Sequence, residues 1–223
     1  MAIITQKQLY EDAILRTSRD HIHQYKWATK LNTLILWEEV WDSVHKFPLS
    51  NKTKSIIWEQ IHLNFYTQYS YNKWHGKTDV CPLCNKLPES IFHIILHCDF
   101  VNSIWIHLQP ILNHLHNKTI NDEEKALGIV HIKKSTGMIL RNWVTYKMRE
   151  TIMQFERTSF YAPPSLELFK AKFNQAMVYE IKGLMIRYKN ENKLATFDKL
   201  IAYKGILCKK VKEGEYRFQI ILS

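Results

Sequence analysis

The sequence predicts a mainly α-helical fold that ends in a small C-terminal β-hairpin. Only 6 Gly and 6 Pro occur in 223 residues, so few positions interrupt long helices. Apolar residues make up 46% of the chain and include 7 Trp, 11 Tyr and 10 Phe, which is enough material for a hydrophobic core. The apolar residues recur mostly at steps of three and four, the period of a helix that buries one face.

The N-terminal elements follow from this periodicity. We expect a helix within residues 6–30, followed by an extended approach to the next helix. Residues 34–46 place Leu34, Trp37, Trp41 and Val44 on one helix face. Phe47-Pro48-Leu49 then breaks the chain. Ser50 is a suitable N-cap for a helix whose buried face holds Ile57, Ile61 and Phe65. Residues 70–79 lack any such pattern and predict a loop.

The later elements are read in the same way. Residues 89–108 have helical spacing, and Pro110 with the polar stretch 113–121 predicts a boundary. A long helix is expected over 136–158, and Ser165 is a suitable cap for the next, over 166–189. A short helix near 194–204 ends around Gly205. Two β-prone runs, 206–211 and 216–222, flank a turn that contains Gly214 and predict the hairpin.

One short segment carries the densest chemistry of the chain. Cys81 and Cys84 have the Cys-x2-Cys spacing that lets a tight turn present two thiolates to one ion. His93 and Cys98 follow in a helical stretch and supply a second pair. Zinc prefers four such nitrogen and sulfur ligands in a tetrahedron, so the segment predicts a structural zinc knuckle. Zinc binding is worth about 10–16 kcal/mol in small fingers, enough to decide whether so short a segment folds.

The fourth ligand is open between two neighbours. In a regular helix His97 lies about 40° from His93 and Cys98 about 140°, which favours His97. Helix ends near metal sites often distort, and a spacing of four intervening residues is within the accepted range. We therefore prefer Cys98 and keep His97 as the alternative.

Charge is divided unevenly along the chain. Residues 1–131 hold 13 Lys/Arg and 13 Asp/Glu, whereas residues 132–223 hold 18 and 8, so the net charge of +10 lies entirely in the second part. This asymmetry favours a polyanionic partner. Met1–Thr5 is apolar but stops at Gln6-Lys7, and no run approaches the roughly 20 apolar residues of a membrane span. We expect an intracellular protein of the nucleus and/or cytoplasm, with no membrane partner.

The tryptophan, histidine and cysteine residues of the chain occur in an order that resembles the sequence pattern of a known family. Trp58 and His62, Trp74-His75, Cys81-Pro82-Leu83-Cys84, His93, Cys98 and Trp105 resemble the zinc-binding region that follows the polymerase in LINE-type (non-LTR) retrotransposon reverse transcriptases. Ala126-Leu127-Gly128, Phe155-Glu156-Arg157 and Pro163-Pro164 resemble the family's C-terminal tail. The resemblance runs from about residue 30 to residue 205. It implies that Cys98 is the fourth ligand, and that the chain binds element RNA, target DNA or both beside the polymerase part of a parent protein.

The catalytic motifs of that family are missing. The chain has no Asp-Asp pair for a polymerase palm, and neither Pro110, Pro163 nor Pro164 precedes an Asp, as a linked endonuclease would require. The sequence therefore predicts a binding module and not an enzyme. A metalloenzyme that uses His62, His75 or His97 is a competing hypothesis, which a zinc ion saturated by protein ligands disfavours.

Candidate nucleic-acid contacts are cations for phosphates and aromatic rings for bases. Near the metal they are Lys73, Trp74, His75, Lys77 and Lys86. In the basic part they are Lys133, Lys134, Arg141, Lys147, Arg149, Lys182, Arg187 and Lys189. RNA is favoured over duplex DNA because no helix shows an isolated base-reading face. In the alternative hypothesis the chain is a structural or protein-interaction module. The zinc knuckle then only connects helices, and the basic C-terminal region binds an acidic protein.

Three segments summarise the predicted organisation. They are an N-terminal helical region over 1–75, a Cys-Cys-His-Cys zinc knuckle over 76–108 and a basic C-terminal helical region over 109–223. The fold is thus a helical domain with an inserted zinc knuckle.

Overall fold

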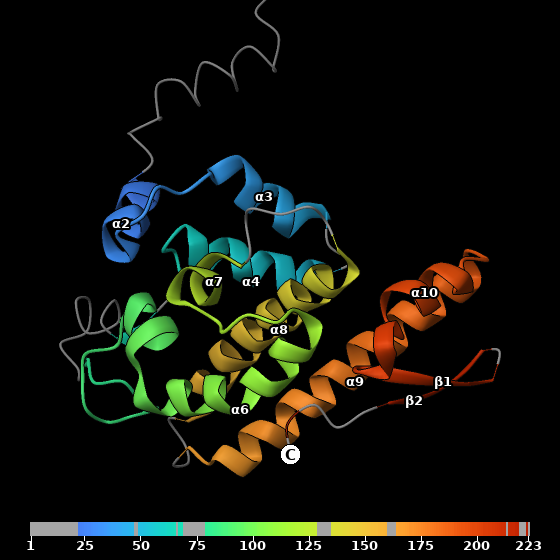
Figure 1. The fold of residues 1–223 in the computed structure, drawn as a ribbon. Coiled ribbons are helices and arrows are strands. Elements are labelled where there is room, and N and C mark those ends of the chain that lie inside the picture. The colour runs from blue at the N-terminus through green and yellow to red at the C-terminus, as the bar shows by residue number, and fades with distance from the viewer. Residues whose placement is uncertain are drawn as a thin grey trace, which may run out of the picture. The chain divides into compact units, whose positions relative to one another are not determined.

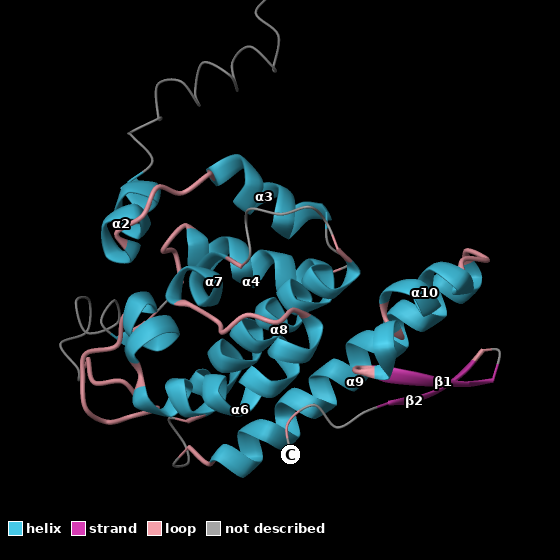
Figure 2. Ribbon diagram, in the orientation of Figure 1, coloured by secondary structure: helices cyan, strands magenta, loops and turns pink. Residues whose placement is uncertain are grey.

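The computed structural model describes residues 22–46, 49–65, 67–68, 79–128, 135–159, 164–212, 214–218 and 222. The chain divides into two compact units, residues 1–35 and residues 36–223. Helices dominate and the strands form one C-terminal hairpin, which confirms the predicted fold class (Figure 2). No helix in the described ranges has both the length and the hydrophobicity to cross a bilayer. The predicted division into three segments stays a prediction.

The first unit contributes one described helix, α2 (Ile22–Leu31). Asn32 follows its last residue with a left-handed φ of 49°, and the amide of Thr33 donates to the carbonyl of Ala28. This is a common way to satisfy carbonyls at a helix end, and Asn tolerates the left-handed region. The helix expected within residues 6–30 overlaps α2, and its earlier part lies outside the described residues.

The second unit carries the remaining described elements. In chain order they are α3 (Trp37–Lys46), α4 (Asn51–Ile61), the π-helical turn η1 (His93–His97), α6 (Asp99–Leu115), α7 (Asp122–Leu127), α8 (Thr136–Thr158), α9 (Leu166–Asn190), α10 (Leu194–Leu200) and the 3-10 turn η2 (Tyr203–Gly205). The hydroxyls of Ser50, Ser135 and Ser165 accept amides at the starts of α4, α8 and α9. The caps predicted at Ser50 and Ser165 are therefore confirmed.

The hairpin pairs β1 (Cys208–Lys212) with β2 (Glu215–Phe218) in antiparallel register. Cys208 faces Phe218 and Lys210 faces Tyr216 across the ladder. The turn between the strands contains Gly214 with a φ of 72°, a value that glycine adopts without a steric penalty. The predicted hairpin is thus present, and β1 begins at Cys208, two residues later than the sequence suggested.

The boundary predicted from Pro110 and residues 113–121 is present but does not start at Pro110, because α6 continues through this residue and ends at Leu115, inside the polar stretch. Pro110 and Ile106 are exposed, so the carbonyl that loses its amide donor lies on the solvent side. A further helix, α7, begins at Asp122, directly after this polar stretch. Its signals are the Asn121 cap, three acidic residues in the first turn and Gly128 at the end.

Helix α8 lies at the centre of the second unit, with α4, α6 and α9 packed around it (Figure 1). It is buried on nearly all sides although it carries many polar and charged residues. Two glycines let neighbours approach closely. A Cβ on Gly137 would lie 2.1 Å from the carbonyl oxygen of Leu115, and one on Gly128 would lie 2.5 Å from the hydroxyl of Tyr146.

The cations of α8 make buried intramolecular contacts. Arg141 pairs with Glu124 of α7 and donates to the carbonyls of Leu112 and His116, both at 2.7 Å, at the end of α6. Lys147 donates to Glu150 at 2.7 Å and to Glu180 of α9 at 3.2 Å. These contacts connect α8 to the C-terminal end of α6, to α7 and to α9.

Arg149 is buried with less compensation than the other two cations. Its Nε donates to Gln60 Oε1 at 2.8 Å, while its two terminal nitrogens have no hydrogen-bond partner among the described residues. Burial lowers the pKa of Arg149 to about 10. The prediction that Arg141, Lys147 and Arg149 contact nucleic acid is therefore wrong, because all three lie in the core and two of them hold it together through ion pairs.

We predict opposite effects of the same substitution at two positions of α8. Arg141→Met should lower the free energy of unfolding by about 3–5 kcal/mol, because it leaves the Glu124 carboxylate buried without a counter-charge. Arg149→Met should be neutral or stabilising, because it removes a buried charge whose two terminal nitrogens have no hydrogen-bond partner among the described residues. Urea denaturation of both variants measures the difference. Equal destabilisation by the two substitutions would contradict the assigned contacts.

Candidate metal centre

Cys81 and Cys84 lie in a tight turn closed by backbone hydrogen bonds. The amide of Asn85 donates to the carbonyl of Cys81 at 2.8 Å, and the amide of Cys81 donates to the carbonyl of Leu87, also at 2.8 Å. Asn85 has a φ of 54°, the left-handed conformation that reverses the chain. An antiparallel bridge between Val80 and Pro88 closes the loop. Both sulfurs are therefore held by a short, internally bonded turn.

The second pair of ligands is positioned by a π-helical turn. The hydroxyl of Ser90 accepts the amide of His93 at 3.1 Å, and the amide of Cys98 donates to the carbonyl of His93 at 2.7 Å. This bond spans five residues instead of four, so Cys98 returns over His93 where a regular helix would have placed His97. Cys98 is buried and His97 is exposed. The turn explains why helical angles alone favoured the wrong neighbour.

The structure brings the four predicted ligands to one point. The ligand atoms of Cys81, Cys84, His93 and Cys98 all lie within 4.8 Å of one another, and Cys84 Sγ lies 3.3 Å from His93 Nε2. Cys84 is half-buried and the other three are buried. Cys208, the remaining cysteine, lies in β1 and is not part of this cluster.

The electrostatics of the cluster favour a bound cation. A hydrogen bond with Cys98, burial and the charge of Cys98 raise the pKa of the Cys81 thiol well above its ordinary value, while the amides of Cys84 and Leu83 lower it. Thiolates so close together need a cation between them. Burial and the neighbouring His97 lower the pKa of His93, which favours the neutral imidazole that ligates metals. Three thiolates and one imidazole suit zinc, and they leave no open position on a tetrahedral ion.

A buried pair of carboxyl groups connects the knuckle to α8. Glu89 follows the turn and its carboxylate accepts the amide of Gln68, while Glu156 lies near the end of α8. Burial and the adjacent Glu89 raise the pKa of Glu156 to about 9. Glu156 is therefore protonated at neutral pH and donates to Glu89, so that only one negative charge is buried.

The predicted nucleic-acid contacts are distributed unevenly. Lys86 lies on the knuckle turn and pairs with Asp99 at 2.7 Å. Lys182, Arg187 and Lys189 are exposed on α9, and their role as contacts stays a prediction. The remaining candidates, Lys73, Trp74, His75, Lys77, Lys133 and Lys134, lie outside the described residues.

A larger group of exposed cations surrounds those on α9. Every described Lys and Arg between residues 182 and 217 is exposed, and we call this group the basic surface: Lys182, Arg187, Lys189, Lys193, Lys199, Lys204, Lys209, Lys210, Lys212 and Arg217. The sequence prediction named only the first three. The uneven charge was its signal, because the buried stripe of α9 from Phe169 to Leu184 leaves the rest of the helix for polar residues.

The comparisons with known proteins agree with the metal centre. Residues 5–105 match the family described as zinc-binding in reverse transcriptase. This range includes all four ligand residues and ends at Trp105, so the resemblance seen in the sequence is confirmed there. Residues 106–223 lie outside the match. No curated protein and no solved structure gives a significant match to the chain.

We predict that metal binding distinguishes the two neighbours in η1. Cys98→Ser should abolish stoichiometric zinc binding, because it removes one of the four converging ligands. His97→Ala should retain it, because this side chain is exposed. Metal content of the purified variants, measured by mass spectrometry, provides the test. Zinc retained by Cys98→Ser and absent from His97→Ala would reverse the ligand assignment.

We also predict a pH dependence that comes from Glu156. Because folding raises its pKa from 4.5 to about 9, the folded state binds more protons between these values, and stability falls as the pH rises. Relative to Glu156→Gln, the zinc-loaded wild type should lose stability between about pH 6 and pH 8. Denaturation at several pH values measures this difference. The exposed Glu38→Gln is the control, and parallel curves for Glu156→Gln and wild type would contradict the shared proton.

Proposed function

We propose that this protein is a zinc-dependent nucleic-acid-binding module, which resembles the C-terminal segment of a non-LTR retrotransposon reverse transcriptase and favours RNA. The observation that carries this proposal is the basic surface on the second half of α9, on α10, on η2 and on the hairpin. Only Glu191, Asp198 and Glu215 offset its cations among the described residues between 182 and 217. A concentration of positive charge of this kind attracts the phosphate backbone.

The basic surface offers both kinds of contact that single strands use. Lys193, Lys210 and Lys212 are held by ion pairs to the three acids of the surface. The ammonium of Lys182 lies 5.5 Å from the centroid of the Phe218 ring, so a cation and an aromatic ring stand together. Phosphates would pair with the cations and bases would stack on rings.

Zinc has a structural part in this proposal. Three thiolates and one imidazole complete its coordination, so the ion orders the knuckle and does not take part in a reaction. The knuckle and the hairpin lie at opposite sides of the second unit in Figure 1, the knuckle in green and the hairpin in red. The metal centre therefore supports the domain while the basic surface supplies the main contacts.

The remaining features of the proposal follow from this arrangement. The chain acts as a binding module without catalysis, in the nucleus and/or cytoplasm where RNA is found. RNA is favoured because the cations lie on helices, a turn and a hairpin, and not on one helix shaped for the major groove. DNA and the polymerase part of a parent protein are further partners.

One observation favours a second function, that of a protein-interaction module. Tyr179 and Ile186 are 70% and 56% exposed, and they lie seven residues apart on the same side of α9. Large apolar side chains on one exposed face are typical of contacts with another protein. In this alternative the basic surface meets an acidic partner, and the chain binds no RNA or DNA.

We predict that removing charge from α9 weakens RNA binding. Arg187→Gln combined with Lys189→Gln should reduce the affinity for single-stranded RNA. The dependence of log K on log salt should fall by about 0.7 for each phosphate that the protein no longer neutralises. Fluorescence anisotropy over a range of salt concentrations measures both quantities. Cys84→Ser, which removes a metal ligand, should lose zinc and lower the affinity through loss of structure.

The matched control removes the same charge from α4. Lys52→Gln with Lys54→Gln should leave the affinity close to that of the wild type apart from a small long-range effect. Equal reductions in the two double variants would show that only net charge matters. An absence of RNA and DNA binding by the zinc-loaded wild type would favour the protein-interaction module.

A further inference from the structure

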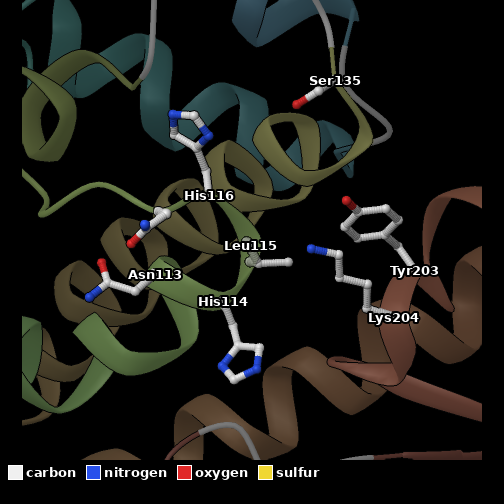
Figure 3. Close-up of a pocket in the computed structure, with 8 residues that line it drawn as sticks. Asn113, His114, Leu115, His116, Ser135, Tyr203 and Lys204 are labelled. Carbon is white, nitrogen blue, oxygen red and sulfur yellow. The ribbon is translucent and has the colours of Figure 1, made fainter.

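A pocket of about 530 Å³ opens between three segments of the second unit. The end of α6 forms one side, Ser135 at the start of α8 forms the second, and η2 forms the third (Figure 3). Figure 3 shows the side chains of Tyr203 and Lys204 entering it from η2, with Ser135 on another side. The volume is within the range of sites that hold small organic molecules, and exceeds what a single ion needs.

The charges around this pocket favour an anion. Among the described residues that line it, Lys204 is the only one with a formal charge, beside two histidines, and none is Asp or Glu. Three other lysines of the basic surface, Lys193, Lys210 and Lys212, are neutralised by ion pairs, whereas no carboxylate of the described residues pairs with Lys204. Its ammonium instead lies 5.2 Å from the centroid of the Tyr203 ring. A cation–π contact positions the ammonium and leaves its charge available to a ligand.

The helix ends add to this field. Ser135 caps α8, a helix of 23 residues, so the partial positive charge of that N-terminus faces the same space as Lys204. The end of α6 would oppose an anion with its carbonyl groups. Arg141 donates to two of them, those of Leu112 and His116, which reduces this opposition. The pocket thus combines one positioned cation and one helix N-terminus with an α6 end at which two carbonyls already accept hydrogen bonds from Arg141.

We propose that this pocket binds one nucleotide of a single-stranded nucleic acid, with its phosphate beside Lys204 and the N-terminus of α8 and its base against Tyr203. The ligand is a nucleoside phosphate, because the ammonium suits a phosphate, the ring suits a base and the volume holds both. This proposal rests on the proposed function. In it, the pocket is the part of the basic surface that makes the most specific contact with a bound strand.

The test compares three substitutions in the full, zinc-loaded chain. Lys204 has a φ of 52°, and Asn tolerates this left-handed backbone, so Lys204→Asn removes the charge without adding strain. Its affinity for a labelled single-stranded oligouridylate should fall about five- to tenfold. Lys204→Arg should retain the affinity. Lys199→Asn removes an exposed lysine that does not line the pocket, and should have less effect than Lys204→Asn.

A second arm separates the nucleotide from the strand. Uridine 5′-monophosphate is titrated against the wild type and Lys204→Asn, with changes in the NMR signals of His114 and His116 as the readout. If the free nucleotide binds the wild type and does not bind Lys204→Asn, the result supports the site and shows that a free nucleotide is a sufficient ligand. Binding of the oligonucleotide only, weakened by Lys204→Asn, supports the site as part of a strand-binding surface.

The outcomes distinguish this inference from the proposed function. Oligonucleotide affinity and salt dependence that are equal in the wild type and Lys204→Asn would overturn the pocket and leave the nucleic-acid-binding function intact. A wild type that binds no oligonucleotide would overturn the function. In that case, a nucleotide titration that depends on Lys204 would still support the pocket, and one that shows no binding would overturn it as well.

Discussion

The burial of α8 is the constraint on which the second unit depends. A helix that carries Arg141, Lys147, Glu150 and Glu156 can be enclosed only if its neighbours bring groups of matching chemistry. Its neighbours do so: α7 provides Glu124, α9 provides Glu180, α4 provides Thr53, α6 provides the carbonyl of Leu112, and Glu89 reaches from the knuckle. The polar contacts of α8 therefore help to fix the order and the spacing of the helices around it, and Arg149 is one place on α8 where this compensation is incomplete.

The metal centre and the polar core meet at the shared proton of Glu89 and Glu156. The knuckle adds buried apolar residues, among them Ile94 and Ile95, to its ligand bonds and to this contact with α8, and all three contribute to its order. The basic surface lies at the other side of the same unit (Figure 1). In the proposed function, one end of the second unit would hold a stabilising metal ion, and the other end would supply the cations that contact nucleic acid.

The sequence predicted the elements that depend on local chemistry. Serine caps, the apolar stripes of α8 and α9, the hairpin and the Cys-x2-Cys turn all follow from neighbouring residues. It did not predict the burial of Arg141 and Lys147, because their partners Glu124 and Glu180 come from other helices and have no signal near α8. The choice of Cys98 depends on one shifted backbone hydrogen bond, which periodicity does not record. Pro110 was read as a helix end, but α6 tolerates this proline because the carbonyl that loses its amide donor faces solvent. Sequence spacing does not show which side of a helix is exposed.

Lysine footprinting of the zinc-loaded chain, with and without bound single-stranded RNA, tests the division between core and surface most directly. Acetylation followed by mass spectrometry measures the reactivity of each lysine. We expect RNA to protect Lys182, Lys189 and Lys204, to leave Lys52 and Lys54 unaffected, and buried Lys147 to react slowly in both samples. Protection confined to Lys52 and Lys54, or ready reaction of Lys147 in the folded protein, would contradict this division.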